Sequence, residues 1–187
     1  IMQDIHLEKI IILDFGSQYT QLIARKIREQ KVYCEILPCN LPFEKIKLCN
    51  PKGIIFSGGP SSVYKKNAPL CSKKIFELNI PILGICYGMQ LMAHLLNGKV
   101  ASSSKREYGR AVLKHSTSSP LFLGLKQEIK VWMSHGDRIK SLPEGFTSTA
   151  QTNNSPYAVM EDNKRNFYGL QFHPEEAHTE QGVDILK

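Results

Sequence analysis

The sequence lacks the long apolar run of a membrane protein, since no segment approaches the roughly 18–20 apolar residues that span a bilayer. The first ten residues, IMQDIHLEKI, also lack the basic, apolar and cleavage regions of a secretory signal peptide. Hydrophobic residues are 42% of the 187 residues and charged residues 22%, which is ordinary for a soluble protein. We therefore expect no membrane partner and one globular domain over residues 1–187.

The sequence also lacks cysteine spacings that indicate a disulfide framework or a zinc site. The number of cysteines is odd, and no two of them are spaced as C-x-x-C. Free thiols are typical of a reducing compartment, so we expect a cytoplasmic protein without a bound metal. The five cysteines are Cys34, Cys39, Cys49, Cys71 and Cys86.

An arginine-rich run is missing too, although the formal net charge is +7. The basic residues are scattered in pairs, such as Lys65 with Lys66 and Lys105 with Arg106, and do not alternate with aromatic residues. A nucleic-acid-binding domain concentrates such charges on one helix or one stripe. We therefore expect no nucleic-acid partner and interpret the charge as a solvated surface or a docking face.

The first half of the sequence alternates between apolar runs and amphipathic segments. The runs at residues 9–17, 32–37, 52–59 and 80–86 predict strands, and the first of them is continuous enough to be buried on both faces. Segments 18–30, 43–49, 68–78 and 89–96 predict helices. In the first helix, Tyr19, Leu22, Ile23 and Ile27 are expected on one face. This alternation predicts a doubly wound, flavodoxin-like α/β fold whose sheet is flanked by helices.

The second half is richer in strands. Segments 109–116, 128–135, 146–152, 157–163 and 166–173 predict strands with little helix between them, so the sheet is expected to be mixed and antiparallel in its later part. A helical pattern returns at 180–187, and the sequence stops inside it. We expect from this ending a domain cut from a longer protein, with a natural end in mid-helix as the alternative.

The segment GICYGMQ places Cys86 between an apolar strand and a helix, with Gly84 and Gly88 two residues to either side. This G-x-C-x-G pattern is that of a nucleophile elbow, in which a sharp turn strains the nucleophile and leaves no room for flanking side chains. The amide dipoles of the following helix favour a thiolate. From this segment alone, a buried structural cysteine is an equally good interpretation.

A base for Cys86 is expected at His173, which follows an apolar strand at the edge where such folds gather active sites. In an extended segment Glu175 would lie on the same side as His173, could orient its imidazole and would favour the protonated form. Glu176 would then point away. Considered alone, His173 is better interpreted as a strand-end residue that caps a loop.

Backbone donors for an oxyanion are expected at two places. The amide of Tyr87 directly follows the candidate nucleophile, and Gly58 and Gly59 in SGGP let an N–H approach without a side chain in the way. A glycine turn after a strand is common, so SGGP alone is weak support. His135, in WMSHGD at another expected strand end, is a further pocket candidate.

The segments GICYGMQ, FHPE and SGGP together resemble the class I glutamine amidotransferases. DFGSQY, KREYGRA, VWMSHGD and HPEEAHT narrow the resemblance to the glutaminase domains of GMP synthases, and it covers essentially the whole chain, residues 1–187. The resemblance implies the catalytic residues Cys86, His173 and Glu175, an oxyanion hole that includes Gly59 and Tyr87, and substrate-binding positions at Gln90, Ser134 and His135.

The implied reaction is hydrolysis of glutamine to glutamate and ammonia through a cysteinyl thioester, without a cofactor in this domain. The family passes the ammonia to an ATP-pyrophosphatase (synthetase) domain that uses ATP and Mg²⁺ to aminate XMP to GMP. That domain and the dimerisation domain are missing from these residues, which contain no phosphate loop like SGGVDS. The implied partner is therefore a synthetase domain in cis or as a separate subunit, and we expect slow hydrolysis by the isolated chain.

Two alternatives stay open. The chain could be the glutaminase of another class I enzyme, such as that of CTP or anthranilate synthesis, although DFGSQY and WMSHGD disfavour this. It could also be a flavodoxin-like binding module with a buried, inert cysteine. One departure concerns Glu176, where the family often has a small apolar residue; a glutamate turned toward the pocket would raise the pKa of His173.

Overall fold

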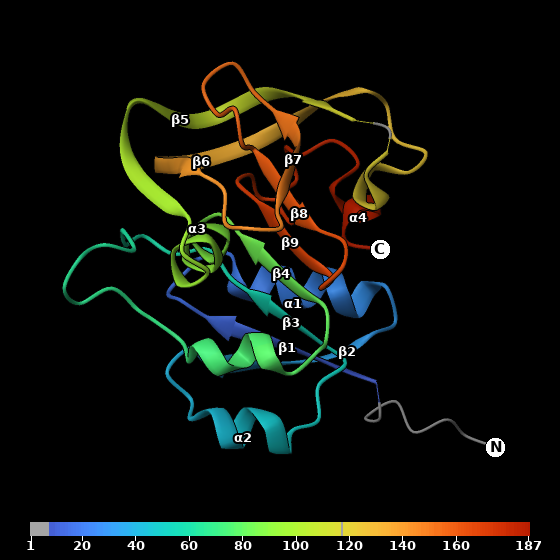
Figure 1. The fold of residues 1–187 in the computed structure, drawn as a ribbon. Coiled ribbons are helices and arrows are strands. Elements are labelled where there is room, and N and C mark those ends of the chain that lie inside the picture. The colour runs from blue at the N-terminus through green and yellow to red at the C-terminus, as the bar shows by residue number, and fades with distance from the viewer. Residues whose placement is uncertain (1–7, 117) are drawn as a thin grey trace.

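The computed structural model describes residues 8–116 and 118–187, and its centre is a mixed sheet flanked by helices (Figure 1). In the described residues the strand order is β2-β1-β3-β4-β9-β8-β7-β5-β6. The strands are β1 (Lys9–Asp14), β2 (Tyr33–Pro38), β3 (Gly53–Phe56), β4 (Ile82–Ile85), β5 (Lys99–His115), β6 (Glu128–Ser141), β7 (Thr147–Gln151), β8 (Val159–Asp162) and β9 (Phe167–Leu170). The helices are α1 (Thr20–Glu29), α2 (Phe43–Leu48), α3 (Tyr87–Leu95) and α4 (Gly182–Ile185), with 3₁₀ turns η2 (Lys73–Glu77) and η3 (Pro120–Phe122).

The predicted α/β class is confirmed, and its parallel part consists of β2, β1, β3, β4 and β9. Side chains alternate between the two faces of these strands. Ile12, on β1, is buried in one cluster with Ile23 and Ile27 of α1. Its neighbour Ile11 is buried in a second cluster that includes residues of α2 and α3. Both faces of the parallel strands are therefore covered, as their continuous apolar runs predict.

Two helical predictions needed correction. In α1 the buried residues are Thr20, Ile23, Ala24 and Ile27, whereas Tyr19 precedes the helix and lines a pocket, so the expected face was partly wrong. The helix expected at residues 68–78 is only the short η2. The residues before η2 are irregular and are tied to α3 instead, because the Pro69 carbonyl accepts a hydrogen bond from the Tyr87 hydroxyl at 2.6 Å.

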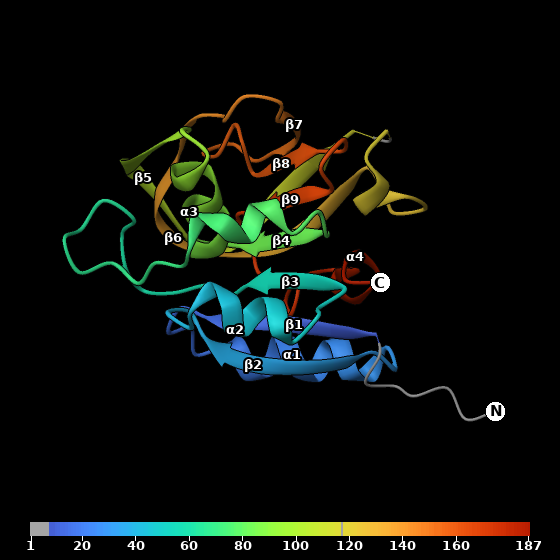
Figure 2. The same cartoon turned by 60° about the horizontal axis from the view of Figure 1, so that its bottom comes forward.

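The second half is antiparallel, as predicted, except that β9 also pairs parallel to β4. Strands β5 and β6 form a long hairpin at the far edge of the sheet (Figures 1 and 2). The hairpin is longer than expected. Strand β5 begins at Lys99, earlier than expected. Residues 99–108 have no apolar alternation that would reveal a strand, and residues 99–102 and 107–108 pair with β6. His135 consequently lies inside β6 and not at a strand end.

A long segment, residues 57–72, connects β3 to η2 and contains no helix or strand. It extends away from the sheet in both views (Figures 1 and 2). Its tether to the hairpin is a hydrogen bond from the Tyr64 hydroxyl to Oδ1 of Asp137, at 2.8 Å. Within the described residues, none of the helices is both long and apolar enough to cross a membrane.

Candidate active site

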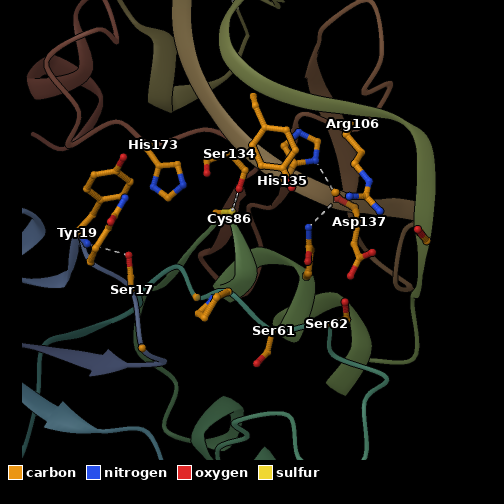
Figure 3. Close-up of a pocket in the computed structure, with 18 residues that line it drawn as sticks. Ser17, Tyr19, Ser61, Ser62, Cys86, Arg106, Ser134, His135, Asp137 and His173 are labelled. Carbon is orange, nitrogen blue, oxygen red and sulfur yellow. Dashed lines mark hydrogen bonds between the residues drawn. The ribbon is translucent and has the colours of Figure 1, made fainter.

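A cavity of about 500 Å³ opens where the carboxyl ends of β1, β3 and β4 meet strands β5 and β6 (Figure 3). The carboxyl edge of parallel strands is where open α/β sheets place their ligands. Every element that borders the cavity contributes polar groups to it. The lining includes residues 16–19 after β1, 59–62 after β3, Cys86 and Gln90 at α3, Ser102, Arg106 and Tyr108 of β5, residues 134–137 of β6, and His173.

Cys86 stands at the sharp turn between β4 and α3, with backbone angles of φ 53° and ψ −107°. A positive φ is unusual for a residue with a side chain and costs on the order of 1–3 kcal/mol. The flanking glycines permit the turn. A Cβ on Gly84 would lie 2.6 Å from the carbonyl carbon of Gly88, and a Cβ on Gly88 would overlap the carbonyl oxygen of Phe56. The local geometry is that of the elbow expected from the sequence.

The thiol of Cys86 is turned toward the cavity although the residue is only 4% exposed. Its Sγ lies 3.5 Å from the carbonyl oxygen of Ser134 on β6 and 3.8 Å from Nε2 of Gln171. The sulfur therefore has two polar groups beside it, although Cys86 also packs in the apolar cluster that contains Ile85. Cys34, by contrast, does not line the cavity, and its burial raises the pKa of its thiol.

His173 and Glu175 are brought together as the sequence predicts, but through a different backbone shape. Nδ1 of His173 lies 2.8 Å from Oε1 of Glu175, and both residues are almost completely buried. The chain there is a turn and not an extended segment, because the amide of Glu176 donates to the His173 carbonyl at 3.3 Å. Thr179 fixes the same carbonyl with its hydroxyl at 2.7 Å. The expectation from strand alternation was therefore right about the partner and wrong about the conformation.

The surroundings of His173 favour its protonated form. Burial lowers the pKa of the imidazole, but hydrogen bonding with Cys86 and with Glu175, together with their charges, outweighs burial and raises the pKa well above its ordinary value. Tyr19 packs edge-on against the ring, with the ring centroids 5.0 Å apart. Cys86 and His173 both line the cavity (Figure 3). Glu175, outside the cavity lining, contacts the far side of the His173 ring, so the three residues proposed from the sequence lie together.

The residues expected to supply oxyanion donors lie at the cavity or at the helix that begins beside it. Tyr87 is the first residue of α3, where amide groups have no partner within the helix. Gly59 lines the cavity, and a Cβ there would lie 2.6 Å from the Phe15 carbonyl oxygen. A Cβ on Gly58 would lie 3.1 Å from Cε1 of His173 and 3.7 Å from Cβ of Cys86. Gly58 therefore lets the main chain approach Cys86 and His173, and Gly59 lets it pack against the main chain of Phe15.

The three expected substrate-binding residues all line the cavity, but two of their side chains are engaged with the protein. Nε2 of Gln90 donates to the Asp137 carbonyl at 2.9 Å and to Oε1 of Gln171 at 3.1 Å. The ring of His135, which is 5% exposed, lies between Glu107 and the Asp137 carbonyl. Ser134 faces Cys86 with its carbonyl group.

Several lining residues had no role assigned from the sequence, although they lie in segments already singled out there. Ser17 and Tyr19 belong to DFGSQY, Arg106 to KREYGRA, and Asp137 to VWMSHGD. Only the fold brings these segments to one cavity. Within the described residues, no group of three or more His, Cys, Asp or Glu side chains is arranged to hold a metal ion.

Glu176 is turned toward His178 and not toward the cavity. Its Oε2 lies 3.4 Å from Nδ1 of His178, whose ring packs on Trp132 with the centroids 4.8 Å apart. The outward direction expected for Glu176 is therefore observed, through the turn described above.

The chain was compared with known families and proteins. Residues 11–187 match the family model described as glutamine amidotransferase class-I. The chain is 55% identical over 179 residues to the glutamine-hydrolysing GMP synthase of Acetivibrio thermocellus, and 58% identical over 179 residues to that of Carboxydothermus hydrogenoformans. Each alignment covers 96% of this chain but 35% of the relative, so the chain spans about a third of the length of these relatives.

Solved structures show the same architecture. A protein of Thermoplasma acidophilum, provisionally named as one of the subunits of a GMP synthase, is 32% identical, with a TM-score of 0.86 over 97% of this chain and 91% of that one. A glutamine amidotransferase of Thermotoga maritima, 22% identical, shares the fold with a TM-score of 0.71 over 91% of this chain and 77% of that one.

Proposed function

Because the chain belongs to the class I glutamine amidotransferases, we propose that it hydrolyses glutamine to glutamate and ammonia. The observation that carries this proposal is the strained, cavity-facing Cys86 beside the buried pair of His173 and Glu175. A cysteine needs a base within reach and a third group that orients the base, and these three residues fill the three positions.

In the proposed reaction the Cys86 thiolate attacks the side-chain amide carbon of glutamine. The amides of Tyr87 and Gly59 stabilise the oxyanion of the tetrahedral intermediate. Imidazolium at His173 donates its proton to the leaving nitrogen, which departs as ammonia and leaves a γ-glutamyl thioester. A water molecule, deprotonated by the now neutral His173, then attacks the thioester and releases glutamate with regeneration of the thiolate.

The raised pKa of His173 supports the acid step. An imidazole with its ordinary pKa would be mostly neutral at pH 7 and a poor proton donor. Glu175 determines which ring nitrogen of His173 transfers the proton. Its carboxylate contacts Nδ1, so Nε2 is left for Cys86 and the leaving group. The buried carboxylate and the sulfur together keep the imidazole protonated before the attack.

We further propose that the amino-acid end of glutamine is held by the main chain of Ser134 and His135, and that Gln90 also contacts the substrate. These residues border the same cavity as Cys86. This domain needs no cofactor in the proposed reaction, because the thiol supplies the nucleophile and the imidazole moves the protons.

For the whole protein we propose that the ammonia passes to a synthetase (ATP-pyrophosphatase) domain, in cis or as a separate subunit, that aminates XMP to GMP with ATP and Mg²⁺ in the cytoplasm. The support is that the relatives quoted above bear the name GMP synthase and are about three times as long as this chain. The alternative is a glutaminase of CTP or anthranilate synthesis, whose ammonia would go to an acceptor other than XMP.

Labelling with 6-diazo-5-oxo-L-norleucine, an electrophilic glutamine analogue, tests the glutaminase proposal. We expect one covalent adduct, located on Cys86 by peptide mass spectrometry, blocked by excess glutamine and lost in Cys86→Ala. Cys34→Ala is the matched control, since it removes another buried thiol and keeps the adduct. A chain that takes no adduct, and whose Cys86 resists iodoacetamide as well, would be a binding module and not a glutaminase.

A further inference from the structure

Glu107 is a buried carboxylate in the outer hairpin that the proposed mechanism does not use. The residue is 7% exposed, and its Oε1 accepts from the Thr152 hydroxyl at 2.8 Å. Its Oε2 accepts from the Ser155 hydroxyl and lies 3.1 Å from Nε2 of His135. Burial raises the pKa of Glu107, but the hydrogen bonds from His135, Ser155 and Thr152 outweigh burial and lower the pKa below its ordinary value. The group therefore stays a carboxylate.

The partners of His135 determine its protonation. Nδ1 lies 2.8 Å from the carbonyl oxygen of Asp137, and Nε2 lies 3.1 Å from the Glu107 carboxylate. Both partners are acceptors only, so both ring nitrogens have to carry protons for the two contacts to be hydrogen bonds. His135 is thus held from both sides, by Glu107 and by the main chain of its own strand.

The strand that His135 belongs to is poorly held by ordinary pairing at this place. Ser102 pairs with Asp137 and Glu107 pairs with His135, so residues 103–106 of β5 stand opposite Gly136 alone. Such a bulge interrupts the ladder of backbone hydrogen bonds, and bulges of this kind often lie beside active sites. The contact between Glu107 and His135 lies at the end of the interruption and ties the two strands together across it.

The Asp137 carbonyl connects His135 to the surroundings of Cys86 through hydrogen bonds. It accepts from His135 on one side and from Nε2 of Gln90 on the other, at 2.8 and 2.9 Å. Gln90 also donates to Gln171, whose own Nε2 lies 3.8 Å from Sγ of Cys86. A continuous polar chain therefore runs from Glu107 to Cys86. The other titratable or charged residues that share the cavity with His135 are Tyr19, Cys86, Arg106, Tyr108, Asp137 and His173.

We propose that Glu107 is a positioning residue of the glutamine site: it holds His135 as an imidazolium and thereby fixes the segment 134–137 that binds the amino-acid end of the substrate. This inference rests on the proposed function, since it assigns that segment to glutamine. Because Glu107 acts through His135 on binding and lies away from the sulfur, its loss weakens recognition of glutamine more than the reactivity of Cys86.

The protonation of His135 is measured first, on the wild-type chain labelled with ¹⁵N-histidine. We expect both ring nitrogens of His135 to be protonated at pH 7.5, with the signal assigned by its loss in His135→Gln. A neutral ring in the wild-type chain overturns the proposal. This measurement needs neither a substrate nor a Glu107 variant that folds.

Inactivation by 6-diazo-5-oxo-L-norleucine is then compared between Glu107→Gln and Glu161→Gln. Glu161 is a matched control because it is equally buried and accepts from two hydroxyls, those of Ser119 and Thr149, but does not line the cavity. For Glu107→Gln we expect the concentration of 6-diazo-5-oxo-L-norleucine that gives half-maximal inactivation rate to rise about tenfold or more, as for the loss of a hydrogen bond between charged groups. Iodoacetamide has no amino-acid end. Its rate of alkylation of Cys86 should therefore change less than about twofold between Glu107→Gln and the wild-type chain.

Equal losses in both rates, or an effect no larger than that of Glu161→Gln, would mean that Glu107 only supports the fold, and would overturn the proposal. Absence of labelling in the wild-type chain would overturn the proposed function instead. The histidine spectrum separates the two failures, because it supports or overturns the pairing of Glu107 with His135 on its own.

Discussion

Nδ1 of His173 and Oε1 of Glu175 are 2.8 Å apart in a region from which solvent is almost excluded. Among the described residues, the second oxygen of Glu175, Oε2, has no hydrogen-bond partner although it is buried. A buried carboxylate in that state is stabilised chiefly by a neighbouring positive charge. His173 supplies this charge when protonated, and the Glu175 carboxylate in turn helps to raise the pKa of His173.

Glu175→Gln should therefore lower the pKa of His173, because the amide keeps an acceptor for Nδ1 but removes the negative charge. In the proposed reaction the imidazolium is the acid, and activity is lost on the alkaline side as His173 gives up its proton. The alkaline limb of the pH–rate profile for glutamine hydrolysis should move to lower pH by about one pH unit or more. An unmoved limb would show that another group controls it.

Glu176→Val is the companion prediction and should leave that limb where it is. The Glu176 carboxylate points to His178 and not into the cavity, so its removal takes no charge away from His173. The measurement is the same pH–rate profile, with Glu175→Gln as the positive control. Movement of the alkaline limb in Glu176→Val would mean that Glu176 turns toward His173 in solution.

The sequence was sufficient to predict β1 to β4 of the parallel sheet and three residues that lie together at the candidate site. Apolar runs bounded by glycine reveal buried strands, and the elbow pattern around Cys86 is local, so both can be recognised without a structure. Pairing of His173 with Glu175 was also predicted, because the two residues are close in sequence and either a strand or a turn can bring them together.

What the sequence could not reveal depends on contacts between distant segments. The first half of β5 is polar and becomes a strand only by pairing with β6. Glu107 and His135 are 28 residues apart and meet across that pairing. The interior position of His135 likewise follows from the length of the hairpin, which no local pattern of residues 99–108 indicates.

Alanine at the two glycines of SGGP should fail in two different ways. A Cβ on Gly58 would lie 3.1 Å from the His173 ring, which can yield by a small displacement, whereas a Cβ on Gly59 would lie 2.6 Å from the Phe15 carbonyl oxygen, which cannot. We expect Gly58→Ala to keep the melting temperature within a few degrees and to lose about a hundredfold in glutamine hydrolysis, since small misplacements of catalytic groups are costly. Gly59→Ala should lower the melting temperature markedly.

Calorimetry and the hydrolysis assay on both variants separate the two effects. The prediction is contradicted if Gly58→Ala retains full activity or if the two variants lose stability equally. Full activity would mean that the loop after β3 moves away from His173 more easily than its packing indicates. Equal losses of stability would mean that the His173 ring cannot yield.

The strain at Cys86 leads to a prediction about stability that is independent of catalysis. At φ 53° and ψ −107° any side chain is strained, and glycine is not. Cys86→Gly should relieve about 1–3 kcal/mol of that strain, offset by about 0.5–1 kcal/mol for the greater freedom of glycine in the unfolded chain.

Cys86→Ala is the matched control, because it also removes the thiol but keeps a Cβ in the strained conformation. We expect the free energy of unfolding, measured by urea denaturation, to be larger for Cys86→Gly than for Cys86→Ala by about 1 kcal/mol, with no adduct in either variant. Equal stability of the two, or a more stable alanine variant, would show that the elbow is not strained and that the turn exists without cost to the fold.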